Sequence, residues 1–217
     1  GTGNFTNVSG FETLKTTGNV ATGITTVDGN VADGGSMTVN ALSLTSAVLT
    51  LDGSAELDGS FSITAGGSGD HQITLGQGND TYTSTSTADE DVIATAGDNV
   101  IRTGDGADTI VGGSGNDDMS GEGGADIFQF VSANFTSGDT VSGGAGNDTI
   151  QMTDDSIVTD SDFTNVTSVK TLTTSANINL NAALGAKAMA AGISVVTLID
   201  DGAANTVTLS SGFTSAI

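Results

Sequence analysis

The sequence predicts an all-β fold in which short parallel strands stack into a solenoid. Three observations support this prediction. A nine-residue pattern recurs through the middle of the chain, the flanking segments alternate polar and apolar residues, and the 217 residues include no proline and no cysteine. Proline interrupts strand ladders, so its absence suits a solenoid. We expect a β-rich, solenoid-like segment over 1–64, the repeats over 65–151, and a second β-rich segment over 152–217.

Residues 1–64 should form strands that continue the solenoid. The run 36–51 alternates apolar and polar side chains, as half-buried strands do. Asp-Gly dipeptides at 28–29, 33–34, 52–53 and 58–59 mark turns between such strands. The nine-residue pattern is missing here, so we expect this part to continue the solenoid without it.

The nine-residue pattern is clearest in three consecutive copies, 103–111, 112–120 and 121–129. Each copy has Gly at its fourth place, Asp at its sixth and a large apolar residue at its eighth. Six residues rich in Gly and Asn can turn the chain sharply. The three that follow, polar, apolar and polar, make one short strand with a single inward side chain. Two copies therefore make one coil of the solenoid.

The same frame fits residues 66–74, 75–83, 94–102, 134–142 and 143–151. A one-residue slip interrupts it over 84–93, and four extra residues at 130–133 interrupt it again. The eighth-place residues would form the inward ladder: Ile73, Tyr82, Ile93, Ile101, Ile110, Met119, Phe128, Val141 and Ile150.

Stacked coils bring each sixth-place carboxylate close to the one eighteen residues away, and such a row repels itself unless cations lie between the coils. Calcium suits this arrangement, because it accepts six to eight oxygen ligands, backbone carbonyls included. Folding and metal binding would then be one event. Fourteen of the 26 acidic residues lie between Asp70 and Asp148, where Arg102 is the only fixed cation. For acids outside the sixth place, simple solvation of an acidic surface remains the alternative.

These residues, above all 112–117 and 143–148, resemble the RTX (haemolysin-type calcium-binding repeat) family. The resemblance implies a right-handed parallel β-roll or β-helix, calcium bound between turns two repeats apart, and export by type I secretion. Carried over to this chain, Asp108, Asp126 and Asp148 would form one calcium-binding edge. The other edge would hold Asp80, Asp117 and Asp139, with Asn99 as a weaker member. Glycines of the same turns would belong to the metal sites: Gly104, Gly106, Gly113, Gly115, Gly124, Gly144 and Gly146.

The chain departs from the pattern at three points. His71 and Asn99 stand where the sixth-place Asp is expected, and the slip leaves open whether Asp89 or Asp91 is a ligand. His71 is expected to be a turn residue that replaces Asp. We expect roughly three to six ions in all.

An internal repeat links the two ends of the chain. Residues 4–17 match residues 162–175, and both place apolar residues at every third position, which suggests a long unit repeated along a larger protein. With Gly1 in first position, the chain is expected to be a fragment or a processed product. A short helix is expected over 182–191, with Asn181 as N-cap and Gly192 after its end. Strands should follow at 193–199 and 206–209.

Composition argues against several function classes. A net charge of −22 is unsuited to nucleic acid and to anionic membrane surfaces. No apolar run reaches the ~18 residues of a membrane span, so we expect no membrane insertion. His71 is the only histidine, so no histidine-based relay can be assembled.

We therefore expect a non-enzymatic, calcium-dependent structural module of a secreted, self-assembling bacterial cell-surface protein, similar to a surface-layer (S-layer) protein. Its partners would be calcium ions and like subunits or adjacent modules. The alternatives are a segment of an RTX adhesin, or the secretion domain of a protease or lipase exported by type I secretion.

Overall fold

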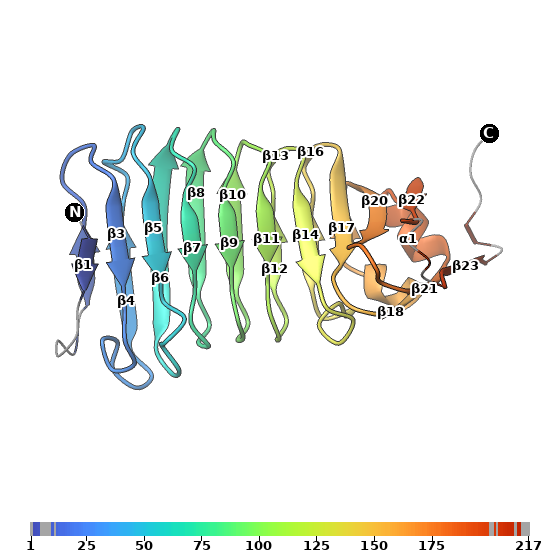
Figure 1. Cartoon of the computed structure of the whole chain (residues 1–217), viewed down its shortest axis with the longest axis horizontal. Helices are drawn as coiled ribbons and strands as arrows, with labels where there is room; N and C mark the ends of the chain where they lie inside the picture. The colour runs from blue at the N-terminus through green and yellow to red at the C-terminus, as the bar shows by residue number, and fades with distance from the viewer. Residues whose placement is uncertain are drawn as a thin grey trace.

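A computed structural model describes residues 2–4, 10, 12–199, 202, 204–210 and 212–213. It confirms the predicted all-β solenoid, with about nine turns (Figure 1). The pairings between strands are parallel, and most strands belong to two long sheets. The ten-stranded sheet contains, in spatial order, β1 (Thr2–Asn4), β3 (Thr22–Thr25), β5 (Leu49–Asp52), β7 (Gln72–Thr74), β9 (Asp91–Ile93), β11 (Thr109–Val111), β14 (Ile127–Phe130), β17 (Asp148–Met152), β20 (Val169–Thr174) and β22 (Val195–Thr197).

The eight-stranded sheet covers the other side of the coil. It contains β2 (Thr13–Lys15), β4 (Ser36–Asn40), β6 (Ser60–Gly67), β8 (Thr81–Ser86), β10 (Val100–Gly104), β12 (Asp118–Ser120), β15 (Thr140–Ser142) and β19 (Val166–Thr167). Two short strands, β13 (Gly123–Gly124) and β16 (Ala145–Gly146), pair within the turns. The ladders run through both expected boundaries, 64/65 and 151/152, so the division into three parts stays a prediction.

Inward side chains form the predicted ladder, with one correction. Eight of the nine predicted residues are buried, but the side chain of Ile93 is 43% exposed, so that prediction was wrong. Its neighbour Val92 is buried instead and lies between Ile73 and Ile110 in the ladder. The reason is that β8 extends to Ser86, so the next strand begins at Asp91 and its middle residue is Val92.

Coil length varies along the solenoid. In the middle, Thr109 of β11 pairs with Ile127, eighteen residues later, as two nonapeptides require. Near the N-terminus Thr13 pairs with Thr38, and near the C-terminus Val141 pairs with Val166, in each case 25 residues later. The longer coils have room for larger apolar cores, whereas the short coils keep one inward residue in each short strand.

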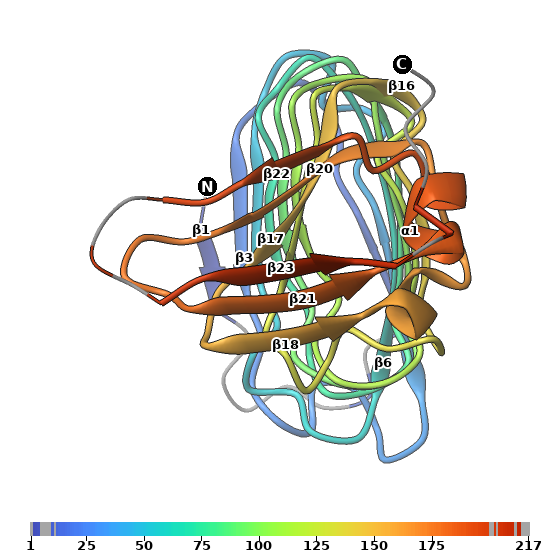
Figure 2. The same cartoon turned by 90° about the vertical axis from the view of Figure 1, so that its right-hand side faces the viewer.

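The C-terminal part adds a smaller three-stranded sheet (Figure 2). Its strands are β18 (Ser156–Thr159), β21 (Leu180–Leu184) and β23 (Thr206–Leu209), and a 3₁₀ turn, η1, spans Asp160–Phe163. The expected helix is present as α1 but covers only Ala186–Ala191. Residues 180–184 are a strand because Leu180, Ala182 and Leu184 all point into the core.

The ends of α1 also differ partly from expectation. Asn181 lies in β21 and does not cap the helix. The Asp160 carboxylate accepts hydrogen bonds from the backbone N–H of Gly185, Lys187 and Ala188, at 2.7 to 3.1 Å, and so caps α1 from the preceding coil. Gly192 ends the helix as predicted, with a φ of 108°. The predicted strands at 193–199 and 206–209 are present as β22 and β23.

Part of the internal repeat can be followed in the structure. Phe163, Val166, Val169 and Leu172 are buried, and Leu14 packs against the core in β2. Phe5, Val8 and Phe11 lie outside the described residues. Among the described residues, no helix is long and apolar enough to cross a membrane.

Candidate calcium-binding turns

The sixth-place residues gather at two edges of the solenoid, as the repeat requires. The first edge consists of the turns that enter the ten-stranded sheet, and the second of the turns that enter the eight-stranded sheet. The structure places Asp108, Asp126 and Asp148 in consecutive coils at the first edge. At the second edge it places Asp80, Asn99, Asp117 and Asp139 in consecutive coils.

Each sixth-place aspartate ties its coil to the preceding one. Its Oδ1 accepts a hydrogen bond from a backbone N–H one coil earlier, between 2.7 and 3.1 Å away. At the first edge the bonds are Glu90 to Asp108, Asp108 to Asp126, and Asp126 to Asp148. At the second edge they are Phe61 to Asp80, Asn99 to Asp117, and Asp117 to Asp139.

The second carboxylate oxygen of these residues has no protein partner in most cases. A buried Oδ2 without a hydrogen bond occurs at Asp80, Asp108, Asp117, Asp126 and Asp148. All five side chains are at most 2% exposed. Leaving a buried carboxylate oxygen unpaired is costly, and a hard cation between the coils removes that cost. These aspartates therefore fit calcium on the evidence of their own geometry.

Electrostatics leads to the same conclusion. Burial raises the pKa of Asp80, Asp108 and Asp117 to about 6 and that of Asp126 to about 7. For Asp126 the charges of Asp108 and Asp148 add to the effect. A bound cation would favour the ionised form of each carboxylate and so reverse these shifts.

Asp139 is an exception within the second edge. Its Oδ2 accepts hydrogen bonds from the backbone N–H of Thr136, at 2.9 Å, and from the Thr136 hydroxyl, at 3.3 Å. Burial raises the pKa of Asp139 as well. Thr136, at the third place of the same copy, thus supplies a partner that the other turns do not.

The predicted glycines shape the turns. Gly106, Gly115, Gly124 and Gly146, at the fourth place, have φ between 134° and 142°, which only glycine adopts easily. Gly104, Gly113 and Gly144, at the second place, have φ between 87° and 96°. A Cβ atom at any fourth-place glycine would collide with a backbone carbonyl of the turn one coil earlier. Glycine is therefore what lets successive turns lie close enough to share ions.

The slip near residue 90 leaves neither Asp89 nor Asp91 at the sixth place, because Glu90 occupies it. The Glu90 backbone N–H donates to Asp108 as the repeat requires. The longer Glu90 side chain turns inward, where Tyr82 donates to Oε2 at 3.0 Å and Ser84 donates to Oε1 at 2.8 Å. Burial raises the pKa of Glu90 to about 8. Sequence reasoning missed this residue, although its place eighteen residues before Asp108 was a usable signal.

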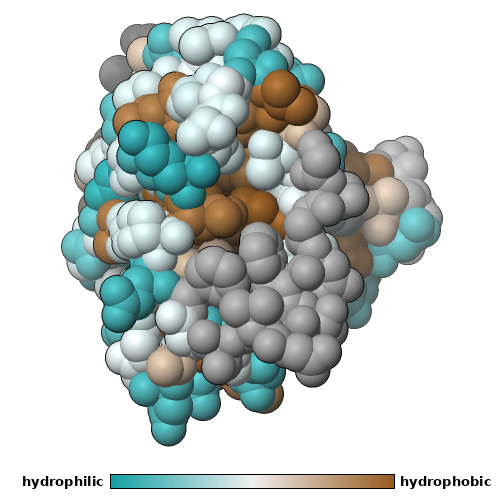
Figure 3. All heavy atoms as spheres, turned by 90° about the vertical axis from the view of Figure 1, so that its left-hand side faces the viewer, coloured by the Kyte–Doolittle hydropathy of each residue, from teal (hydrophilic) through white to brown (hydrophobic). Residues whose placement is uncertain are grey.

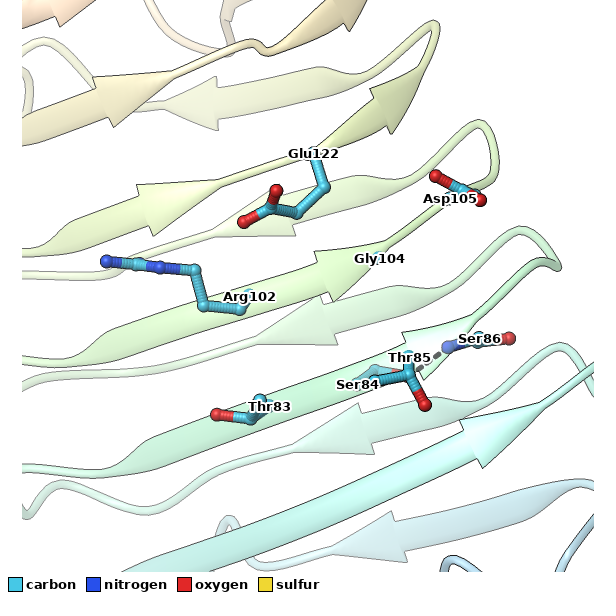
Figure 4. A pocket seen from close by; sticks show the side chains of 8 residues that line it. All are labelled: Thr83, Ser84, Thr85, Ser86, Arg102, Gly104, Asp105 and Glu122. Carbon is cyan, nitrogen blue, oxygen red and sulfur yellow. Dashed lines mark hydrogen bonds between the residues drawn. The ribbon is translucent and has the colours of Figure 1, made fainter.

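Two further features of the structure bring charged side chains together. A groove on the eight-stranded sheet has Arg102, Asp105 and Glu122 in its lining, but these side chains do not converge on a point (Figure 4). The Arg102 guanidinium lies 2.6 Å from the Asp118 carboxylate. Asp28, Glu56 and Asp58 each offer an oxygen within 4.8 Å of the others. Glu56 is already bonded to the N–H groups of Val31 and Gly59.

Two carboxylate-lined edges on a parallel β-solenoid define a class of protein in which successive coils offer oxygen atoms suited to cations. The family model of the RTX calcium-binding nonapeptide repeat matches four copies, over residues 93–128 and 135–151. Residues 93–128 and 135–151 are therefore RTX calcium-binding repeats. No curated protein and no solved structure matched the chain.

Proposed function

We propose that this chain is a non-enzymatic, calcium-dependent structural module of a secreted bacterial protein that assembles on the cell surface in the manner of an S-layer. The observation that carries the proposal is the row of buried aspartates, each with one unpartnered oxygen, between stacked coils. Without cations the carboxylates repel each other, and with calcium they link coil to coil. The repeat region of such a chain stays unfolded in a calcium-poor cytosol and becomes ordered outside the cell.

The ends of the solenoid support self-assembly. Among the described residues, β22 ends the ten-stranded sheet and β23 ends the three-stranded sheet, so each offers an edge to a further strand. Large apolar side chains are exposed nearby, with Val195 48%, Leu198 45% and Leu209 56% exposed. Apolar surface is also visible at the centre of the N-terminal end (Figure 3). Solenoid ends of this kind are suited to stacking on another copy or on an adjacent module.

The surroundings of His71 support a non-enzymatic role. This side chain is fully buried, and its Nδ1 accepts a hydrogen bond from the backbone N–H of Leu49 at 3.0 Å. Its Nε2 contacts the Gly66 carbonyl at 3.2 Å. Burial also lowers the pKa of His71. A histidine held in this way supports the coil and has no access to a substrate.

The test is calcium-driven assembly of the chain. Circular dichroism and negative-stain electron microscopy would be recorded with EGTA, with millimolar calcium and with millimolar magnesium. We expect a gain of β signal followed by sheets or filaments with calcium alone. A β signal that is the same in EGTA and in calcium would contradict calcium dependence. Calcium-induced folding to a persistent monomer would instead favour a segment of an RTX adhesin or a secretion domain.

A further inference from the structure

Asn99 stands at the second edge between Asp80 and Asp117, in a place where the repeat calls for aspartate. Its Oδ1 accepts the backbone N–H of Asp80 at 2.9 Å, just as each neighbouring aspartate uses Oδ1 to accept an N–H from the coil before. The Nδ2 of Asn99 must then lie where an aspartate would place its unpartnered Oδ2.

The surroundings of this nitrogen are made of oxygen atoms. Nδ2 lies 3.3 Å from the Ala96 carbonyl, 3.1 Å from the Gly97 carbonyl, 3.1 Å from the Gly112 carbonyl and 3.0 Å from the Asp117 carboxylate. Two coils contribute to this cage, 94–99 and 112–117. Carbonyl and carboxylate oxygens from two chain segments are a ligand set that suits calcium. In this coil, however, the side-chain amide of Asn99 already points into the cage of oxygen atoms.

Rotating the amide would not free the cage for an ion. Exchanging Oδ1 and Nδ2 would set the Nδ2 hydrogens against the backbone N–H of Asp80, donor against donor, and leave that buried N–H without an acceptor. The Asn99 side chain is 1% exposed, so water cannot supply the missing bond. The observed orientation satisfies Asp80 and places an N–H group, which a cation repels, inside the cage.

At the first edge, one coil earlier, another residue, His71, also stands where the repeat calls for aspartate. His71 accepts the N–H of Leu49 on Nδ1, so its proton is on Nε2, which faces the Gly66 carbonyl and lies 3.9 Å from the Glu90 carboxylate. Both Glu90 oxygens are in turn bonded to Tyr82 and Ser84. Nitrogen donors and hydroxyls therefore take the place of cations in these coils.

We infer that Asn99 is not a calcium ligand and that its side-chain amide fills the cation position between coils 94–99 and 112–117. The residues of this layer do not fit the ion that the repeat family implies, and the column of calcium sites along the second edge is interrupted there. The inference rests on the proposed calcium binding of the remaining aspartates. It differs from the sequence-based expectation that Asn99 is a weaker member of this edge.

The test counts and locates ions in the full chain. Native mass spectrometry in calcium would compare the unmodified chain with Asn99→Asp, which restores the carboxylate without changing side-chain size. Asn116→Asp is the matched control, because it adds the same charge at an exposed position in the neighbouring turn, 112–117. Crystals of the unmodified calcium-loaded chain would locate ions by anomalous scattering, a measurement that does not depend on whether a variant folds.

We expect Asn99→Asp to bind one more calcium ion than the unmodified chain, and Asn116→Asp to bind the same number as the unmodified chain. No anomalous peak should lie among Ala96, Gly97, Gly112 and Asp117. A peak there, an unchanged ion count for Asn99→Asp, or an equal gain by both variants would overturn the inference. An unmodified chain that binds no calcium at all would instead overturn the proposed function as well.

Discussion

The coils before residue 76 and the coils over residues 103–151 have the same parallel architecture but are held together differently. The early coils bury large side chains such as Leu49, Leu51, Phe61 and Ile63, all at most 1% exposed. In the later coils, strands such as β11 and β12 bury a single apolar residue, and the turns bury several carboxylates with unpartnered oxygens. Apolar burial stabilises at any calcium concentration, whereas stacked carboxylates stabilise only with cations. One solenoid therefore combines a core-stabilised part with an ion-stabilised part.

Removal of calcium should distinguish the two regions most strongly. In EGTA we expect a large but partial loss of β signal, because the ion-stabilised coils unfold while the early coils keep their core. Far-ultraviolet circular dichroism measures this loss, and readdition of calcium is the control for reversibility. A complete loss would mean that the early coils depend on the later ones.

A core substitution in the early coils should lower the free energy of unfolding by the same amount with and without calcium. Phe61→Ala removes a side chain that is 1% exposed and should lower the free energy of unfolding by ~3–5 kcal/mol. Urea unfolding with and without calcium measures the change. Leu42→Ala, at a side chain that is 50% exposed, is the control and should change stability by less than about 0.5 kcal/mol. If the effect of Phe61→Ala depended on calcium, the division into a core-stabilised and an ion-stabilised part would be contradicted.

A ligand substitution in the later coils should show the opposite behaviour. Asp117→Ala removes one unpartnered oxygen, so we expect calcium affinity to fall roughly tenfold, or ~1.4 kcal/mol. Calcium titration followed by circular dichroism measures the midpoint. Asp118→Ala is the control, because Asp118 is half-exposed and paired with Arg102 on the surface, where such pairs contribute at most about 1 kcal/mol. Equal effects would mean that the assignment of the sixth place is wrong.

Lowering the pH of the solution should stabilise the folded state of the calcium-free chain. The pKa of Glu90 is raised to about 8, so the folded state binds its proton more tightly than the unfolded state does. Its contribution to stability is fully present below the ordinary glutamate pKa and is lost as pH rises through about 8. The raised pKa of Asp126, about 7, acts in the same direction. We expect the melting temperature in EGTA to fall between pH 5 and pH 8.5.

Glu90→Gln isolates the contribution of Glu90 to this pH dependence. Glutamine is close in size and can bond to Tyr82 and Ser84 but does not titrate, so the slope of melting temperature against pH should become shallower above pH 7. An unchanged slope would show that other groups cause the effect.

The smallest expected effect concerns one turn residue. Glu122 has a φ of 61°, where the other repeats place Gly104, Gly113 and Gly144 at the same second place. Glu122→Gly should stabilise the calcium-loaded chain by about 0.5–1 kcal/mol, because glycine adopts positive φ without strain. Glu122→Ala, which removes the charge but not the strain, should bring no such gain in thermal unfolding.

Much of the architecture could be predicted from the nine-residue frame. The frame states which residue points inward and which carboxylates meet, and it is correct wherever the coil has eighteen residues. It fails at Ile93, because the polar run of β8 carries no glycine to show where the strand ends. The alanine-rich stretch 182–191 was ambiguous between helix and strand, because alternating small residues also suit a strand. Burial of Ala182 and Leu184 made the first part of this stretch a strand.

The local chemistry of the turns was harder to predict. The sequence shows that Asn99 and His71 replace aspartate, but not that Nδ2 of Asn99 and Nε2 of His71 face oxygen atoms. That result depends on the backbone N–H groups of Asp80 and Leu49, which lie one coil away and fix which atom points where. The inward turn of Glu90 toward Tyr82 likewise depends on a contact between strands. Such details follow from the stacking of coils and not from the repeat itself.

Hydrogen exchange resolved by peptide, with calcium and with EGTA, tests the central claim most directly. The account predicts that peptides from β4 to β7 keep their protection in EGTA, while peptides from β11 to β17 lose it and regain it when calcium is restored. Equal protection of both regions in EGTA, or equal loss in both, would contradict a solenoid stabilised by its core at one end and by ions in its middle.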